Sequence, residues 1–125
     1  MMEPLEVTRL ARALAAYSGE RLSLIAENVA NSDTPGFHAR DLPNFGAVFR
    51  DDAGSLRQTR PGHLSGSANS ASAVESLGHA SLDGNTVSLE AEMVRAAEVR
   101  QDHATALAVY RSTSDIIRTA LGRRV

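Results

Sequence analysis

The C-terminal segment carries the most restrictive pattern in this sequence. One stripe of residues recurs there in alternating steps of four and three, the heptad spacing of a helix that packs along its whole length against another helix. The stripe comprises Leu89, Met93, Ala96, Arg100, His103, Leu107, Tyr110, Ser114, Ile117 and Leu121. Ser88 precedes it as a candidate N-cap, and Glu90 and Glu92 suit the positive start of a helix. We therefore predict a long helix that begins after Ser88.

The N-terminal segment repeats this spacing over a shorter length. Its stripe comprises Val7, Leu10, Leu14, Tyr17, Arg21 and Leu24, and a second stripe of Leu22, Ile25 and Val29 lies beside it. Pro4 suits a first helical turn, where its missing N–H is not needed. We expect this helix to begin near Leu5 and to end near Ala30, because turn-forming residues follow it.

Residues 37–85 show no sustained period. Asp51 to Gly54 reads as a turn, and Gly62 to Gly84 is rich in Ser, Gly, Ala and Asn, which is typical of a mobile loop with at most short strands. The predicted fold is mainly α, with the N- and C-terminal helices pairing as an antiparallel coiled-coil hairpin. We divide the chain into an N-terminal helix and corner (1–36), an irregular middle segment (37–85) and a C-terminal heptad helix (86–125), the first and last forming one helical domain.

Charge and composition exclude several functions. The 125 residues include 13 basic and 15 acidic side chains, a formal net charge of −2. Nucleic acid is therefore not an expected partner, because no basic excess is present to neutralise phosphates. No apolar run approaches the roughly 20 residues of a membrane span, and none forms a signal-peptide core. We expect no membrane insertion, and any export without a cleaved signal peptide.

Catalytic and metal sites are not expected either. The chain has no cysteine, and its serines and histidines show no Gly-x-Ser-x-Gly elbow or rigid frame. His79 and Asp83 lie four residues apart, but Gly78 and Gly84 argue against the helix that would place them on one face. The sequence predicts no enzyme activity, no cofactor and no metal.

Apolar side chains also occur outside the predicted seam. Val109, Ile116 and Ala120 give the C-terminal helix a second apolar edge, which a two-helix hairpin would leave uncovered. Neighbouring copies or other chains could cover it. We expect the helices to be stabilised by assembly into a polymer or part of one.

The end of the first helix is an unusual corner, comprising Asn28, Asn31, Thr34, Pro35, Gly36 and Phe37. Asn tolerates the left-handed conformation and bonds exposed backbone groups, Pro fixes one turn angle, and Gly supplies a positive φ. The residues predict a rigid corner, and an ordinary helix stop without a partner role is the simpler interpretation of the same chemistry.

The corner resembles a family signature. Asn28-Val29-Ala30-Asn31 followed by Thr34-Pro35-Gly36-Phe37 is similar to the motif near the N-terminus of bacterial flagellar rod and hook proteins. Within that family, the short chain, the Thr59-x-x-x-His63-Leu64 segment and Asp83 to Val87 before the last helix resemble a proximal rod subunit. Phe37 stands where Tyr is common, His38 where a basic residue is common, and His103 where we expect Tyr.

The resemblance implies a structural subunit of a hollow drive shaft that transmits torque from the rotor ring to the distal rod and hook. The implied partners are further copies, other rod proteins, rotor-ring and rod-adaptor proteins at the rod base, and the flagellar type III export apparatus in transit. The implied location is the basal-body rod in the periplasmic space. The corner would be an assembly contact, and the helix-packing seam would comprise Leu10, Leu14, Tyr17, Leu24, Leu89, Met93, His103, Leu107, Tyr110, Ile117 and Leu121.

Two alternatives share these features. A soluble coiled-coil adaptor or export chaperone would show the same helical pattern but has no need of the corner. Another proximal-rod relative would share the N-terminal signature. Within the seam, His103 either packs as a neutral aromatic side chain, which we favour, or titrates as a pH-sensitive group.

Overall fold

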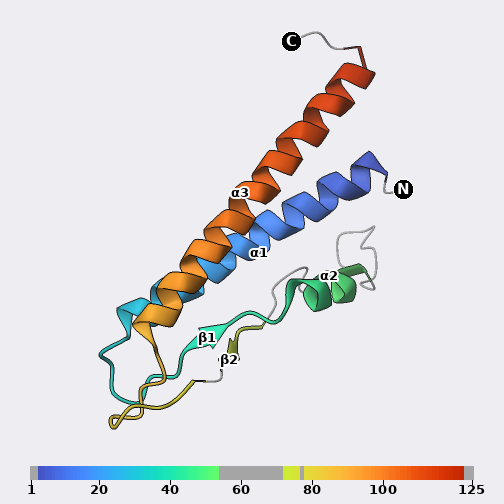
Figure 1. Ribbon diagram of the computed structural model, residues 1–125. Helices are drawn as coiled ribbons and strands as arrows, with labels where there is room; N and C mark the ends of the chain where they lie inside the picture. The colour runs from blue at the N-terminus through green and yellow to red at the C-terminus, as the bar shows by residue number, and fades with distance from the viewer. Residues whose placement is uncertain (1–2, 54–71, 77, 123–125) are drawn as a thin grey trace, which may run out of the picture.

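The computed structural model describes residues 3–53, 72–76 and 78–122. Two long helices run antiparallel and diverge toward the chain ends, while the middle segment lies alongside them (Figure 1). This arrangement confirms the predicted mainly α hairpin. The elements in chain order are α1 (Pro4–Ala30), β1 (Arg40–Asp41), α2 (Phe45–Ala53), β2 (Val74–Glu75) and α3 (Leu89–Ala120).

Both long helices begin and end close to their predicted limits. Pro4 occupies the first turn of α1, and Ser88 caps α3 by accepting a hydrogen bond from the N–H of Ala91 at 3.4 Å. At 1.5 Å per residue, 27 and 32 residues give helices of roughly 40 and 48 Å. The molecule is therefore an elongated hairpin with its corner at one end and both termini at the other (Figure 1).

The face that α3 presents to α1 is offset from the predicted seam. Its fully buried positions fall seven residues apart, at Glu92, Val99, Ala106 and Thr113. His103, Leu107 and Ile117 of the predicted stripe are half-buried beside this line, whereas Leu89, Met93, Arg100, Tyr110 and Leu121 are exposed. The difference has a physical reason: besides Val99, the contact is made by the small or polar residues Glu92, Ala106 and Thr113, so the largest apolar side chains mark an adjacent face.

On α1 the buried line is also seven residues apart, at Ala11, Ser18 and Ile25. Its predicted seam residues Leu10, Leu14, Tyr17 and Leu24 are half-buried on a neighbouring side of the helix. Tyr17 contacts the middle segment, since its hydroxyl donates to the Pro43 carbonyl at 2.6 Å and its ring lies 5.3 Å from the ring of Phe45. Part of the predicted seam therefore holds the middle segment instead of α3.

The middle segment contains one element that the sequence analysis missed. The predicted turn at Asp51 falls inside α2. Asn44 starts this helix by accepting the Gly46 N–H on its side chain at 2.9 Å, and the rings of Phe45 and Phe49 lie one helical turn apart at 5.7 Å. The aromatic pair stabilises a helix in a segment whose Gly and Asp residues suggest a turn.

The remaining middle segment contains the expected short strands. β1 and β2 pair antiparallel, with Arg40 opposite Glu75 and Asp41 opposite Val74. The predicted Thr59-x-x-x-His63-Leu64 segment and residues 62–71 and 77 of the Ser/Gly-rich stretch lie outside the described residues. Within the described ranges, no helix has the length and apolar character that crossing a membrane requires.

Candidate assembly surfaces

Asn28 fixes the corner from inside the molecule. Its side chain is fully buried, and its amide N–H donates to the Arg40 carbonyl at 2.8 Å while its amide oxygen accepts the Arg40 N–H at 3.0 Å. The side chain thus pairs with both backbone groups of Arg40, as a neighbouring strand would. Asn is suited to this position because its amide offers a donor and an acceptor at once.

The other corner residues shape the turn after α1. The Asn31 side chain donates to the Glu27 carbonyl at 2.8 Å, and Thr34 Oγ1 donates to Asn31 Oδ1 at 3.2 Å. Gly36 has a φ of +73°, the left-handed conformation expected of it. Pro35 is exposed and Phe37 is half-buried. The corner is therefore rigid, and its outer surface is open to contact.

Asn85 is a corner residue that the predicted site omitted. It is 4% exposed, and its side-chain nitrogen lies within 2.8 to 3.0 Å of the carbonyls of Asn31, Ser32 and Thr34. Its amide oxygen accepts the Val87 N–H at 2.7 Å. These bonds hold the turn that follows α1, where the Asn31 and Thr34 carbonyls also accept the N–H groups of Thr34 and Phe37. The Asp-Gly-Asn sequence was its available signal, because it marks a tight turn before the last helix.

The turns before and after the middle segment lie back to back. The Gly36 N–H donates to the Asp83 carbonyl at 2.9 Å, and the Thr86 N–H donates to the Phe37 carbonyl at 3.0 Å. Gly84 has a φ of +81°, and a Cβ built on it would lie 3.5 Å from the Cα of Gly36. Residues 31–37 and 81–86 therefore form one tip at the end of the hairpin, which Figure 1 shows at the lower left.

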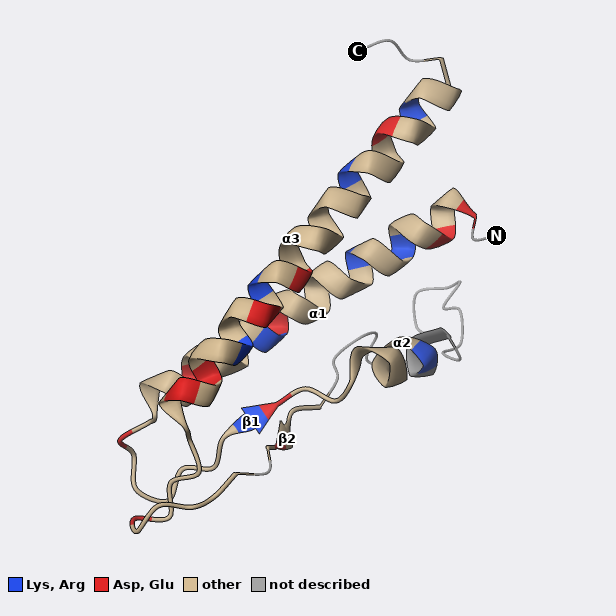
Figure 2. Ribbon diagram, viewed as in Figure 1, with Lys and Arg blue, Asp and Glu red and all other residues tan. Residues whose placement is uncertain are grey.

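A charged cluster joins α1, β1 and α3. Arg21 holds Asp41 with two hydrogen bonds of 2.8 Å, and Arg95 lies 3.5 Å from Asp41 and 2.6 Å from Glu92. Glu92 is 2% exposed, and no described residue donates to its second oxygen, Oε2. The cluster fixes the middle segment against both helices, and Figure 2 shows charged residues of both signs on the paired halves of α1 and α3.

The pKa of Asp41 reflects this environment. Burial raises it, but the hydrogen bonds from Arg21 and the Leu42 N–H, with the charges of Arg21 and Arg95, outweigh burial and hold it below 3.8. Asp41 is consequently ionised at neutral pH. Arg21 lies in a predicted packing stripe, but the sequence carries no signal for Asp41, because the contact between them depends on how the middle segment folds back.

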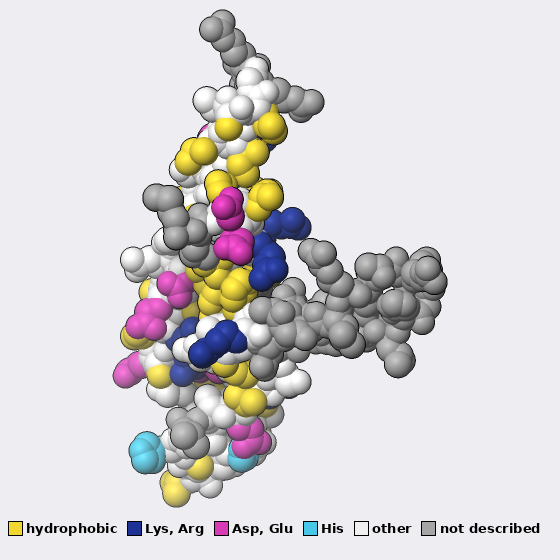
Figure 3. Space-filling view, turned by 90° about the vertical axis from the view of Figure 1, so that its right-hand side faces the viewer, with side chains coloured by type: hydrophobic (Ala, Val, Ile, Leu, Met, Phe, Trp, Pro, Cys, Tyr) yellow, Lys and Arg dark blue, Asp and Glu magenta, His cyan; other side chains and the backbone are white. Residues whose placement is uncertain are grey.

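Large apolar side chains remain exposed on α3. Beyond Thr113 the helix extends past its contact with α1 and Leu121 is 74% exposed, and Tyr110, one turn before Thr113, is exposed as well. Figure 3 shows hydrophobic side chains gathered in this upper part of the molecule. Met93 and Ile116 are exposed by 65% and 60% on the two flanks of the contact line. The helix thus has apolar surface on several sides that this chain does not cover.

Among the described residues, no three His, Cys, Asp or Glu side chains gather as a metal site would require. His79 and Asp83 lie in the turn region before α3, outside any helix.

Comparison with known proteins identifies the family. No protein-family model matches the chain. It is 30% identical over 111 residues to the flagellar basal body rod protein FlgB of Agrobacterium fabrum, an alignment that covers 82% of each chain.

The chain belongs to the FlgB family of flagellar basal body rod proteins.

Two further FlgB relatives support this membership. The Salmonella typhimurium protein is 35% identical over 92 residues, which cover 63% of this chain and 66% of the relative. The Cereibacter sphaeroides protein is 34% identical over 107 residues, which cover 81% and 82%. FlgB membership confirms the family resemblance of the corner motif, and the curated relatives bear the name of a rod component.

Proposed function

We propose that this chain is a structural subunit of the proximal rod of the flagellar basal body. The observation that carries the proposal is FlgB-family membership in a chain whose longest helix exposes large apolar side chains on several sides. Patches of this kind mark contact surfaces, because water-exposed apolar area is unfavourable by about 25 cal/mol per Å² relative to burial. In the assembled rod, neighbouring subunits cover these surfaces.

The helical hairpin suits a shaft that transmits torque. Helices of roughly 40 to 48 Å that pack against several neighbours resist bending and sliding better than loops do. Near the corner, α1 and α3 pack against each other and stabilise the single subunit. Toward the chain ends α3 diverges from α1 and offers its surface to neighbouring subunits. The seam residues Met93, Tyr110 and Leu121, exposed in the single chain, act in these contacts between subunits.

The corner supplies a second assembly contact. Asn28, Asn31 and Asn85 hold the turn from inside, while Thr34, Pro35 and Gly36 are exposed. A rigid turn loses little conformational freedom when a partner covers it. The corner therefore presents a fixed surface to an adjacent rod subunit.

The finer assignments rest on the family resemblance. They comprise the periplasmic part of the basal body as the location, further copies and other rod proteins as neighbours, and rotor-ring and rod-adaptor proteins as partners at the rod base. The flagellar type III apparatus exports the chain. The subunit acts by contact and catalyses no reaction.

An incorporation assay tests the proposal. The chain and its Ile116→Asp variant are expressed in flagellated bacteria that lack their own copy of this subunit, and basal bodies are isolated. Ile116 is 60% exposed, so a charge there is tolerated by the single chain but is unfavourable in an apolar interface. We expect at least a tenfold loss of incorporation and of swimming in soft agar, with unchanged cellular protein levels.

Gln101→Asp is the matched control, because it places the same carboxylate at an exposed polar position of the same helix. The control is expected to incorporate and to restore swimming. Failure of the unmodified chain to enter basal bodies would contradict the proposed function, and normal incorporation of Ile116→Asp would remove the role of the exposed apolar face.

A further inference from the structure

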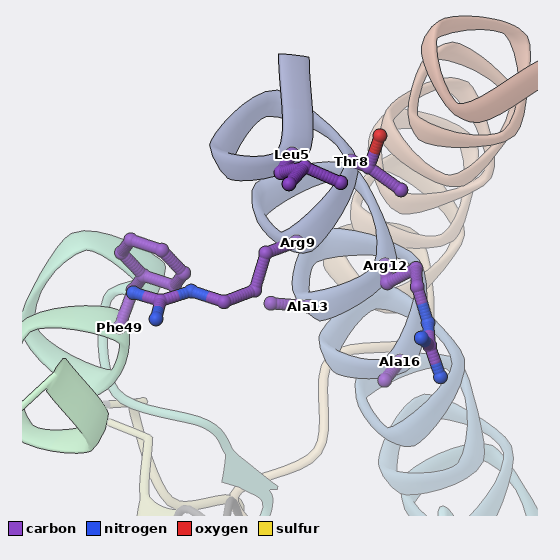
Figure 4. A pocket seen from close by; sticks show the side chains of 7 residues that line it. All are labelled: Leu5, Thr8, Arg9, Arg12, Ala13, Ala16 and Phe49. Carbon is purple, nitrogen blue, oxygen red and sulfur yellow. The ribbon is translucent and has the colours of Figure 1, made fainter. Parts of the chain in front are cut away.

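Complementary features lie at opposite ends of the molecule. One is the tip formed by residues 31–37 and 81–86, and the other is a groove beside the N-terminal half of α1 (Figure 4). We propose that the tip of one copy of this chain seats in the groove of the next copy, so that copies join head to tail. The inference deepens the proposed function and rests on it, since it names one contact between two rod subunits.

The tip presents a single leucine from a rigid turn. Leu82 is fully exposed. The turn around it is closed by hydrogen bonds of 2.9 Å from the Gly84 N–H to the Ser81 carbonyl and from the Ser81 N–H to the Asn85 carbonyl. Because the turn is already ordered, burying this side chain against a partner costs little further conformational freedom. Leu82 is therefore an exposed apolar side chain that a rigid turn holds in position for contact.

The tip is also acidic. Asp33 and Asp83 are exposed, and neither Lys nor Arg occurs among the described residues 31–38 and 78–88. Hydrogen bonds from Ser81 and from the Asn85 N–H hold the pKa of Asp83 below 3.8, so this carboxylate is charged at neutral pH. A partner for the tip must therefore combine an apolar surface with positive charge.

The groove between α1 and α2 offers both properties. It has a volume of about 420 Å³, and its lining includes the small side chains of Ala13 and Ala16, the apolar side chain of Leu5, and two arginines, Arg9 and Arg12. Figure 4 shows Ala13 between the two arginine side chains, which point in different directions. An aliphatic side chain can rest on the alanines while carboxylates approach the guanidinium groups.

Arg9 is held in position by α2. Its guanidinium lies 5.5 Å from the centroid of the Phe49 ring, a cation–π arrangement. A guanidinium stacked on a ring still directs N–H groups along its edge, where a carboxylate can bind. Glu3 and Glu6 lie near the start of α1, but neither lines the groove. The groove is consequently a basic apolar site whose charge complements the acidic tip.

Tip and groove can meet only between different copies. About 19 residues of helix separate Arg12 from Asn31, a distance of roughly 28 Å along α1. Because the two surfaces differ, their contact is heterologous, and an open chain of copies has one free tip and one free groove at its ends. Such a contact produces a ring or a continuing array, in keeping with a rod subunit.

Cross-linking tests the contact directly. The chain has no cysteine, so the double variant Leu82→Cys/Ala16→Cys places one thiol on the tip and one in the groove without competing thiols. Isolated basal bodies that carry this variant are oxidised and run on a non-reducing gel. We expect a ladder of dimers, trimers and larger species, whereas each single variant yields monomer and at most a faint dimer.

A charge exchange provides a second measurement that does not depend on disulfide formation. Arg12→Glu and Asp33→Arg are each expected to lower incorporation at least fivefold, and the double variant is expected to restore it. Arg111→Glu, at an exposed position of α3, controls for a change of net charge and is not expected to be rescued by Asp33→Arg.

The outcomes separate this inference from the proposed function. Incorporation of the cysteine variants without a ladder, or equal incorporation of all charge variants, would overturn the head-to-tail contact while leaving the chain a rod subunit. A ladder from Ile116→Cys/Ala16→Cys in place of the tip variant would overturn it too, and would assign the groove to a neighbouring α3. Rescue by the charge exchange would support the contact even if the cysteine variants fail to incorporate.

Discussion

Individual residues at the corner act through their backbone bonds. Asn28 completes the hydrogen bonding of Arg40, Asn85 bonds three carbonyls of the turn after the first helix, and Gly36 adopts a positive φ. None of them is a large apolar side chain, so the corner depends on polar geometry more than on buried area. Small substitutions here should therefore have effects out of proportion to their size.

Gly36 and Gly19 form a matched pair for this prediction. A Cβ on either glycine would meet nothing within 4 Å, so only backbone conformation distinguishes them. Gly36→Ala is expected to destabilise the chain by about 1–2 kcal/mol, because an L-residue is strained at this φ. Gly19→Ala in the first helix is expected to stabilise it by roughly 0.5–1 kcal/mol. Urea unfolding followed by circular dichroism measures both, and equal effects would contradict the conformational argument.

Asn85→Ala tests the bonds at the tip. The substitution removes the side-chain donor from the Ser32 carbonyl and the side-chain acceptor from the Val87 N–H, whereas the Asn31 and Thr34 carbonyls keep their backbone donors. Each group left without a partner costs about 1–3 kcal/mol. We expect the free energy of unfolding to fall by roughly 2–3 kcal/mol, measured by urea unfolding. Gln101→Ala, an exposed amide on the last helix, is the control with little expected effect. A small loss for Asn85→Ala would show that water replaces these bonds.

At the level of single residues, the sequence indicated the corner but only part of the hydrogen bonding that holds it. The Asn, Pro and Gly residues of the motif are local signals, and Gly36 has the positive φ that its turn predicts. The partners of Asn28 and Asn85 are 12 and about 50 residues away in the chain. Local turn chemistry cannot supply such pairings, because they depend on how the middle segment returns to the hairpin.

Among the elements, the short strand β1 is held to the hairpin by charge. The Asp41 carboxylate forms ion pairs with Arg21 of α1 and Arg95 of α3. One carboxylate therefore fixes three elements relative to one another. Since the pKa of Asp41 is lower in the folded chain than its ordinary value, the stabilisation is present above that ordinary value. It is lost as the pH falls through the folded pKa.

Asp41→Asn tests this link. Near pH 7 the variant is expected to be less stable by roughly 1–3 kcal/mol, because the neutral amide cannot accept two charge-assisted hydrogen bonds from Arg21. As the pH falls below about 4, the unmodified chain loses this extra stability, so the free energies of unfolding of the two proteins converge. Urea midpoints measured between pH 2.5 and 7 check this expectation. Parallel curves over that range would exclude Asp41 as a source of acid sensitivity.

The two long helices were predictable because heptad spacing runs through both, supported by Pro4 in the first turn of α1 and by the Ser88 cap and end charges of α3. The packing faces were not, since Ala106, Thr113 and Ser18 are buried at the contact while Met93 and Leu121 remain exposed. Hydrophobicity alone cannot distinguish a face that packs within the chain from one reserved for neighbours. Helix α2 was missed because its two Phe side chains pack against α1, Phe45 against Tyr17 and Phe49 against Arg9, contacts that local sequence does not reveal.

The whole molecule is a hairpin that closes at the corner and opens toward its termini (Figure 1). Its paired half is fixed by small buried residues and by the charged cluster, and its open half exposes the apolar side chains of α3. A subunit of this shape gains further burial only from other chains. Membership of the FlgB family indicates assembly with other flagellar rod components, since the curated relatives are named as basal body rod proteins.

A density map of assembled basal bodies that contain this chain tests the central claim most directly. The account predicts that α1 and α3 remain antiparallel in each subunit and that Met93, Ile116 and Leu121 are buried against neighbouring subunits. A map in which these side chains face solvent, or in which the subunit is absent from the rod, would contradict it.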